Sequence, residues 1–434
     1  MLKGESCMKK LLTVGTALLL LSTSAFASKA RLQALGEDKD GSFYIPDYRN
    51  LYFNPSEINS LGNMAVLEWG NAGQTFGGLS LDFDSATKAQ GGVLYSLSNG
   101  MKVGAILGDE TDVAALTRAL ASNSLTATAS QFLQTADNVL DVFVGGSAAV
   151  NWGANLLYTN SRSEVTGSRY KQNSLATRLG ANSGAWNAHL LLALGAKAEA
   201  PDNTQVPTYK GKFGARVGGG YDLSPESKVF VMYESYSWKQ DNNVTEEREG
   251  SFNKGILGYG HTKKVNDGGS LFAKAQVEAT NIKLSAVTGL VQAKINRLAI
   301  PVTIGYEHVA KDWLTLRGSV VQNLWGTVKD EGLTANFGTP ASAADFSTTG
   351  KTLRLLANGR YGSSTSGNGG KKTLANSTTV NAGATLTFGS LSVDGLVAAT
   401  PASRTGTLNS TANTNGGVLA LDNLETRVAL TYKF

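Results

Sequence analysis

Apolar and polar residues alternate along much of the chain, so that every second side chain is of the same kind. Within residues 297–307 the apolar positions are Leu298, Ile300, Val302, Ile304 and Tyr306. Residues 212–221 and 271–280 repeat the pattern. Because successive side chains of a β-strand point to opposite faces, each segment is predicted to be a strand with one apolar and one polar face.

Segment length separates the two architectures that such strands can build. A soluble sandwich hides the apolar faces inside, whereas a transmembrane barrel turns them towards lipid. Most of these segments have about 9–14 residues, and a tilted spanning strand needs ~9–11, against ~5–6 in soluble proteins. Aromatic residues such as Tyr221, Tyr306 and Phe388 end the apolar faces, as in the girdles of outer-membrane barrels. We therefore expect an all-β fold, a transmembrane antiparallel β-barrel.

About sixteen strands are predicted, and fourteen or eighteen stay open because residues 76–83 can be a further strand or part of a loop. The expected strands are 61–70, 89–97, 101–108, 138–146, 148–159, 173–183, 185–195, 208–221, 227–239, 248–262, 269–281, 295–308, 312–326, 375–389, 390–400 and 421–434. Short and long connections alternate, as bacterial barrels require. Short turns, and with them both chain ends, are expected in the periplasm. The long connections 109–137 and 327–374 either stay outside or fold into the lumen.

The N-terminus has the pattern of a cleaved secretory signal peptide. Lys9 and Lys10 precede an apolar run at 11–21, and Ala25-Phe26-Ala27 supplies the small residues of a cleavage site. We expect three parts: a signal peptide at 1–27, a plug or hatch-like segment at 28–60 and the barrel at 61–434. The expected location is the outer membrane, with lipid around the strands.

Composition and charge exclude other classes of protein. The chain has 50 glycines and 17% charged residues, which fits many strands with glycine-rich turns and argues against coiled coils. The formal net charge is +5 and no run of five basic residues occurs, so nucleic acid is not an expected partner. The three histidines, His189, His261 and His308, have no metal-ligand spacing, so we expect no metal, no cofactor and no enzyme.

Two segments carry resemblances to known families. The last strand alternates apolar and polar residues and ends in Tyr432, Lys433 and Phe434, which resembles the signal read by the bacterial barrel-assembly machinery. The chain as a whole resembles porin-like outer-membrane proteins of Gram-negative bacteria. Residues 28–60 resemble the hatch of barrels related to the long-chain fatty-acid transporter. The residues that carry the resemblance to the hatch are Asp47, Asn50, Phe53, Asn54 and Pro55.

The polar faces of the strands carry more basic than acidic residues. The candidate pore-lining residues are Arg178, Arg216, Lys274, Glu278, Arg297 and Arg317. Rings of Arg and Lys in a pore favour anions. Alternatively, these charges pair across neighbouring strands and only stabilise the lumen.

The leading functional hypothesis is a porin that lets small hydrophilic solutes or ions diffuse through a water-filled lumen, with mild anion preference. Sixteen strands are enough for an aqueous channel. One alternative is a hatch-gated transporter of hydrophobic molecules, and another is a structural or adhesive surface barrel. A homotrimer stays open, since large porins often associate, although no residue pattern here indicates one.

Overall fold

The computed structural model describes most of the barrel and the segment that precedes it. The described residues are 28–38, 40–71, 88–109, 139–165, 168–199, 208–241, 247–285, 292–331, 371–373, 378–399 and 424–434. The expected signal peptide, residues 76–83, whose expected structure is either a strand or part of a loop, and most of the two long connections lie outside these ranges.

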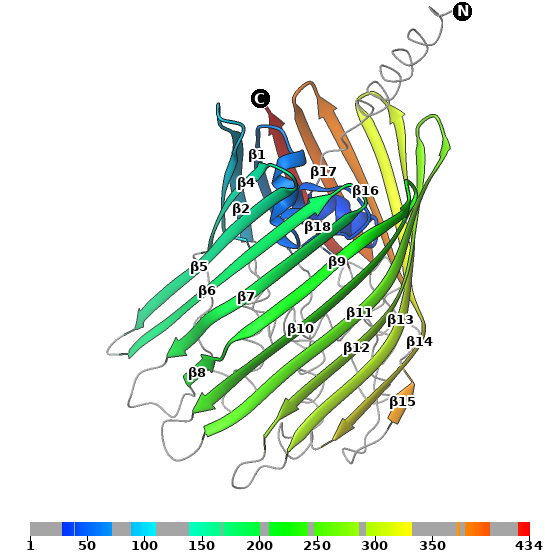
Figure 1. Cartoon of the computed structure of the whole chain (residues 1–434). Helices are drawn as coiled ribbons and strands as arrows, with labels where there is room; N and C mark the ends of the chain where they lie inside the picture. The colour runs from blue at the N-terminus through cyan, green and yellow to red at the C-terminus, as the bar shows by residue number, and fades with distance from the viewer. Residues whose placement is uncertain are drawn as a thin grey trace, which may run out of the picture.

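One antiparallel sheet closes on itself to form the barrel (Figure 1). β1 pairs with both β2 and β18, which closes the ring. β8 and β9 share one wall position between β7 and β10, and β15 and β16 share another beside β14, so the described strands occupy sixteen positions. The strands are β1 Met64–Asn71, β2 Lys88–Ser96, β3 Lys102–Leu107, β4 Val139–Ser147, β5 Asn151–Val165, β6 Ser168–Ser183, β7 Trp186–Glu199, β8 Thr208–Gly211, β9 Gly214–Ser224, β10 Ser227–Asp241, β11 Glu247–Asn266, β12 Gly269–Leu284, β13 Ala293–Lys311, β14 Leu314–Glu331, β15 Lys371–Thr373, β16 Thr378–Phe388, β17 Leu391–Ala399 and β18 Leu424–Lys433.

The expected transmembrane barrel is confirmed, and every expected strand overlaps an observed one. Several strands are longer than expected: β14 continues to Glu331, five residues into the predicted loop 327–374. Ladder hydrogen bonds to β13, which pairs as far as Lys294 with Glu331, carry the strand past its apolar stretch. The alternating pattern marks only the part of a strand that faces lipid, so it misses such extensions.

The two faces of the wall differ as the alternation predicts. Large apolar side chains, including Val217, Leu257 and Ile304, point outwards and are more than half exposed. The alternate positions point into the lumen and hold buried polar residues such as Arg178, Glu234 and Arg297. An apolar outside and a polar inside are the architecture of an outer-membrane barrel.

The segment at 28–60, called the hatch from here on, lies inside the barrel near one end (Figure 1). It consists of α2 Lys29–Ala34, η1 Tyr48–Tyr52 and η2 Pro55–Ser60. Side chains of Ser28, Asp47 and Asn54 cap the three helices by accepting backbone N–H groups of Arg31, Arg49 and Ser56. No helix of the described residues is long and apolar enough to span a membrane.

The hatch lies at the end of the barrel that carries the short turns. The wall strands are joined there by two-residue connections such as 184–185, 267–268 and 389–390. Gly184 and Gly389 have φ of 56° and 60°, a conformation that glycine adopts without strain. Asn54 donates to the carbonyl of Ala181, three residues before the first of these turns, at 3.4 Å. If short turns face the periplasm, the hatch lies at the periplasmic end.

Candidate functional site

Glycines on the inner face of the wall make room for the hatch. A Cβ added at Gly153 or Gly180 would overlap Pro55 or Asn54, and one at Gly260 would overlap the ring of Tyr44. A Cβ at Gly383 would come to 2.7 Å from that of Ala34. These glycines come from β5, β6, β11 and β16, so the wall is shaped to receive the hatch around much of its circumference.

Arg31 connects α2 to the wall through buried ion pairs. Its guanidinium donates to both carboxylate oxygens of Glu307, at 3.0 and 3.1 Å, and to Asp47 at 3.2 Å. Arg317 of the wall donates to the same Glu307 at 2.9 Å and to Asp394 at 3.1 Å. One carboxylate therefore joins a hatch arginine and a wall arginine in a single network.

Arg49 forms the second centre of charge and has no exposed surface. Its guanidinium lies 3.1 Å from Asp109 and 3.2 Å from Asp40, and its central carbon is 4.0 Å from the ring centroid of Tyr52. Although burial opposes the charge, Asp109 is the largest of the influences that raise the pKa of Arg49 above its usual value. Arg49 thus remains a cation that holds η1 against the wall.

Asp47 of the hatch has a pKa close to neutral pH. Burial raises its pKa to about 7, although Arg31 and the N–H of Arg49 lower it. Glu57 at the other edge of the hatch also has a raised pKa, because burial outweighs the hydrogen bond from Asn182.

The six candidate pore-lining residues lie on the inner face, and each has a partner of opposite charge. Arg178 pairs with Asp141 at 2.7 Å, Arg216 with Glu234 at 2.8 Å, Lys274 with Glu37 of the hatch at 2.7 Å and Arg297 with Glu278 at 2.9 Å, while Arg317 forms the network described above. The second sequence interpretation, that the charges pair, describes this arrangement. Whether the six residues line a conducting path stays a prediction.

The partners were harder to find from the sequence than the candidates. Asp141, Glu234 and Lys254, which lies 3.5 Å from Glu278, are on the polar faces of β4, β10 and β11. Their alternation could have placed them in the lumen. Which charges pair depends on the order of the strands in the wall. Arg178 on β6, for example, reaches across β5 to Asp141 on β4.

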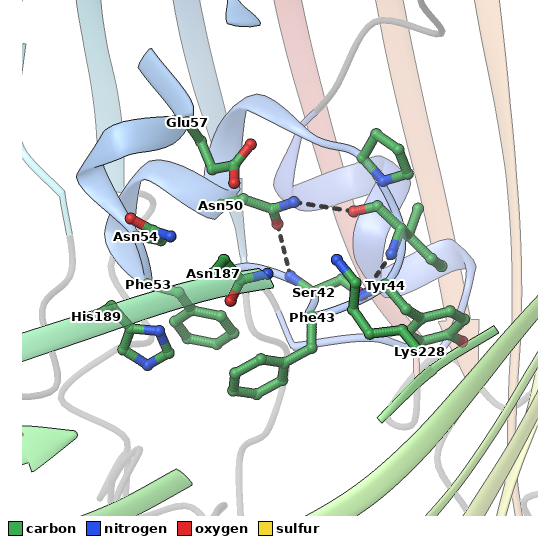
Figure 2. A pocket seen from close by; sticks show the side chains of 12 residues that line it. Ser42, Phe43, Tyr44, Asn50, Phe53, Asn54, Glu57, Asn187, His189 and Lys228 are labelled. Atoms are coloured by element: carbon green, nitrogen blue, oxygen red, sulfur yellow. Dashed lines mark hydrogen bonds between the residues drawn. The ribbon is translucent and has the colours of Figure 1, made fainter. Parts of the chain in front are cut away.

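The hatch-like residues shape a turn and the two short helices. Asn50 accepts the N–H of Ser42 at 2.7 Å and donates to the carbonyl of Ile45 at 3.0 Å, which closes the turn between them (Figure 2). Asn54 caps η2, and Pro55 occupies its first turn, where no N–H donor is needed. Phe53 places its ring against Phe43, with 5.1 Å between centroids.

A pocket of about 120 Å³ separates this edge of the hatch from β7 and β10. Figure 2 shows Phe43 and Phe53 of the hatch beside His189 of the wall. Phe43 also stacks on Phe230 of β10 at 4.6 Å, with the two planes at 3°. The lining residues are Ser42, Phe43, Tyr44, Ile45, Pro46, Asn50, Phe53, Asn54, Glu57, Asn187, His189 and Lys228. The described residues contain no cluster of three or more His, Cys, Asp or Glu that could hold a metal ion.

No family model and no curated protein matches the chain. Solved structures that it resembles include the toluene transporter TbuX of Ralstonia pickettii, with 11% identity, 95% of this chain and 100% of that chain covered, and a TM-score of 0.35. A Pseudomonas aeruginosa FadL homologue has 11% identity, 94% and 98% coverage and a TM-score of 0.35. A bacterial polysaccharide outer membrane secretin has 8% identity, 87% and 99% coverage and a TM-score of 0.43. The expected likeness to hatch-bearing barrels is thus present among the solved structures, but values this low carry no argument about function.

The prediction of an open porin with mild anion preference is wrong. The finding against it lies in the chain itself. The hatch occupies the lumen at the short-turn end, and the basic residues expected to attract anions are paired with carboxylates. The sequence leaves both interpretations of these charges open, because the alternation within a strand does not show which charges pair.

Proposed function

We propose that the chain is an outer-membrane transporter in which the hatch controls the passage of hydrophobic molecules. The observation that carries the proposal is the pocket between hatch and wall, which is lined on one side by the rings of Phe43 and Phe53. Behind the pocket, Phe43 stacks on Phe230 of the wall. Transferring apolar surface from water to such a site is favourable by ~25 cal/mol per Å².

Two kinds of contact hold different edges of the hatch to the wall. Ion pairs at Arg31 and Arg49 hold the hatch to the wall. The edge at Asn54 is held by neutral groups, including the long hydrogen bond to Ala181, and by aromatic contacts. Neutral contacts are cheaper to break than buried ion pairs. A small movement at this edge opens the pocket while the rest of the hatch stays in place.

A disulfide across this edge tests the proposal. In N54C/G180C, the sulfur at position 54 would take the place of an atom that lies 3.0 Å from a Cβ at position 180, which is close enough for a disulfide. Gram-negative cells that express the protein should take up toluene faster than cells without it. Oxidation of N54C/G180C should abolish this gain, and a reductant should restore it, while N54C alone serves as the control.

Two results would contradict the proposal. One is toluene uptake that does not depend on expression of the protein. The other is uptake that is the same in the oxidised and reduced forms of N54C/G180C, because passage would then not require movement at this edge.

Several finer assignments belong to the same proposal. A signal peptide at 1–27 delivers the chain to the periplasm, the C-terminal strand with Tyr432 and Phe434 is recognised by the barrel-assembly machinery, and the protein transports without catalysing a reaction. Phe434 stacks with Tyr432 and Tyr95 at 6.3 and 6.5 Å on the outside of the barrel, a position from which another protein can reach it.

A further inference from the structure

His189 is a buried polar side chain without a hydrogen-bond partner. It is 4% exposed, and neither Nδ1 nor Nε2 has a partner among the described residues. Buried polar groups are nearly always hydrogen-bonded, because leaving one unpaired costs ~1–3 kcal/mol. When such a side chain lines a cavity, a ligand in that cavity can supply the missing hydrogen bond.

The surroundings of His189 explain why the protein itself supplies no partner. On the two neighbouring strands, the residues opposite His189 are Gly180 and Gly218, which have no side chains. Towards the hatch the imidazole meets the rings of Phe43 and Phe53, at centroid distances of 5.9 and 6.4 Å. None of these four residues offers a side-chain donor or acceptor.

Several of the other polar groups around the pocket already have partners. Glu57 accepts a hydrogen bond from Asn182 at 3.1 Å, Lys228 lies 3.1 Å from Asp222, and Asn50 is fixed by Ser42 and Ile45. Figure 2 shows His189 and Phe53 together on one side of the pocket and Lys228 on the other. The two unpaired imidazole nitrogens of His189 therefore lie on the aromatic side.

We propose that this pocket binds a single aromatic ring that carries a hydroxyl group, with the hydroxyl hydrogen-bonded to His189 and the ring packed against Phe43 or Phe53. The inference rests on the proposed function and names the class of molecule that the same pocket selects. The volume of about 120 Å³ is close to that of a cavity of ~150 Å³ that binds benzene. Aromatic rings favour offset or edge contacts at ~4.5–7 Å.

A hydroxyl matches His189 better than a carboxylate does. Neutral imidazole has one donor and one acceptor, and a hydroxyl both donates and accepts, whereas a carboxylate only accepts. The carboxylate of Glu57 lines the same pocket and would repel a second negative charge. The one lysine of the lining is already paired with Asp222.

Binding of phenol, toluene and benzoate to the purified, folded barrel in detergent tests the inference. Ligand-observed NMR gives the three dissociation constants for the wild type and for H189F, which keeps a ring but loses both nitrogens. We expect phenol to bind the wild type about 2–10-fold more tightly than toluene, the range of one net hydrogen bond. H189F should remove this difference between phenol and toluene.

Two further variants control for folding and chemistry. H189Q retains a donor and an acceptor and should keep part of the preference for phenol. H261F replaces a histidine that is bonded to Ser227 at the rim and should behave as the wild type. Heat-modifiable migration on a gel verifies that each variant is a folded barrel.

The outcomes separate this inference from the proposed function. Equal binding of phenol and toluene by the wild type, a phenol preference that survives in H189F, or tighter binding of benzoate than of phenol would each overturn the hydroxyl assignment. In the first two cases the pocket still binds apolar rings, so hatch-controlled transport stands. Failure of all three ligands to bind would overturn the assignment, and the uptake assay with N54C/G180C then decides the transport proposal separately.

Discussion

The two edges of the hatch meet the wall in opposite ways. At Arg31 and Arg49, buried guanidinium groups each contact at least two carboxylates. At Phe43 and Phe53 the contacts are rings and neutral hydrogen bonds around a pocket of about 120 Å³. The difference teaches that a plug can be held firmly by charge on one side and still offer a path to apolar molecules on the other.

Removing Arg49 should have the largest effect on the hatch. In R49M, Asp40 and Asp109 would both lose the guanidinium that lies between them, while Lys29 stays 3.3 Å from Asp109. Breaking a buried ion pair costs ~3–5 kcal/mol. Hydrogen exchange of the hatch amides, measured by mass spectrometry, should become much faster. K212M is the control: its pair with Glu249 is exposed, and exposed pairs contribute only ~0–1 kcal/mol. Equal exchange in both variants would refute the role given to Arg49.

Filling a wall glycine should have the next largest effect. The Cβ in G260A would overlap Tyr44 of the hatch, and overpacking of this kind costs ~1–3 kcal/mol. G255A lies on the same strand, where the nearest atom to the new Cβ is 4.0 Å away, and should leave hatch exchange as in the wild type. If G260A also leaves it unchanged, the hatch does not rest where the structure has it.

Acidity should stabilise docking of the hatch through Asp47. Docked, Asp47 has a pKa of about 7, against an ordinary value of 3.8, so the docked state binds the proton more tightly. The contribution of Asp47 to docking is then largest below pH ~4, falls by up to about tenfold per unit as the pH rises to 7, and changes little above that. Hatch exchange, corrected for its intrinsic pH dependence, measures this trend. D47N should lack it, and a wild type with the same profile as D47N would contradict the assignment.

Replacing Phe43, at the edge of the hatch beside the pocket, should have the smallest effect on the hatch. F43L loses the stacked contact with Phe230, which is worth ~0.5–1.5 kcal/mol beyond burial. It should speed exchange in residues 42–54 by about 2–10-fold and leave α2 unaffected. F388L, on the lipid-facing side and 60% exposed, is the matched control. Faster exchange throughout the hatch of F43L would mean that the two edges do not act independently.

The sequence predicts the strands of the barrel better than it predicts the contacts between the barrel and the hatch. Alternation around residues 297–307 predicts β13 and its lumenal Arg297, because the order of apolar and polar residues along a strand shows which face each side chain is on. The pairing of Lys274 with Glu37 joins residues 237 positions apart, since the hatch must first fold into the closed barrel. The unpaired imidazole of His189 depends on glycines of two other strands. Its lumenal side was predictable, but the lack of a partner was not.

Single-channel current through the purified protein in a planar bilayer, under a salt gradient, tests most directly whether the hatch closes the lumen. The wild type should show no steady conductance steps, whereas R49M, with its hatch weakened, should show openings. Steady large steps from the wild type, with a reversal potential that favours anions, would contradict this account and restore the open, basic channel.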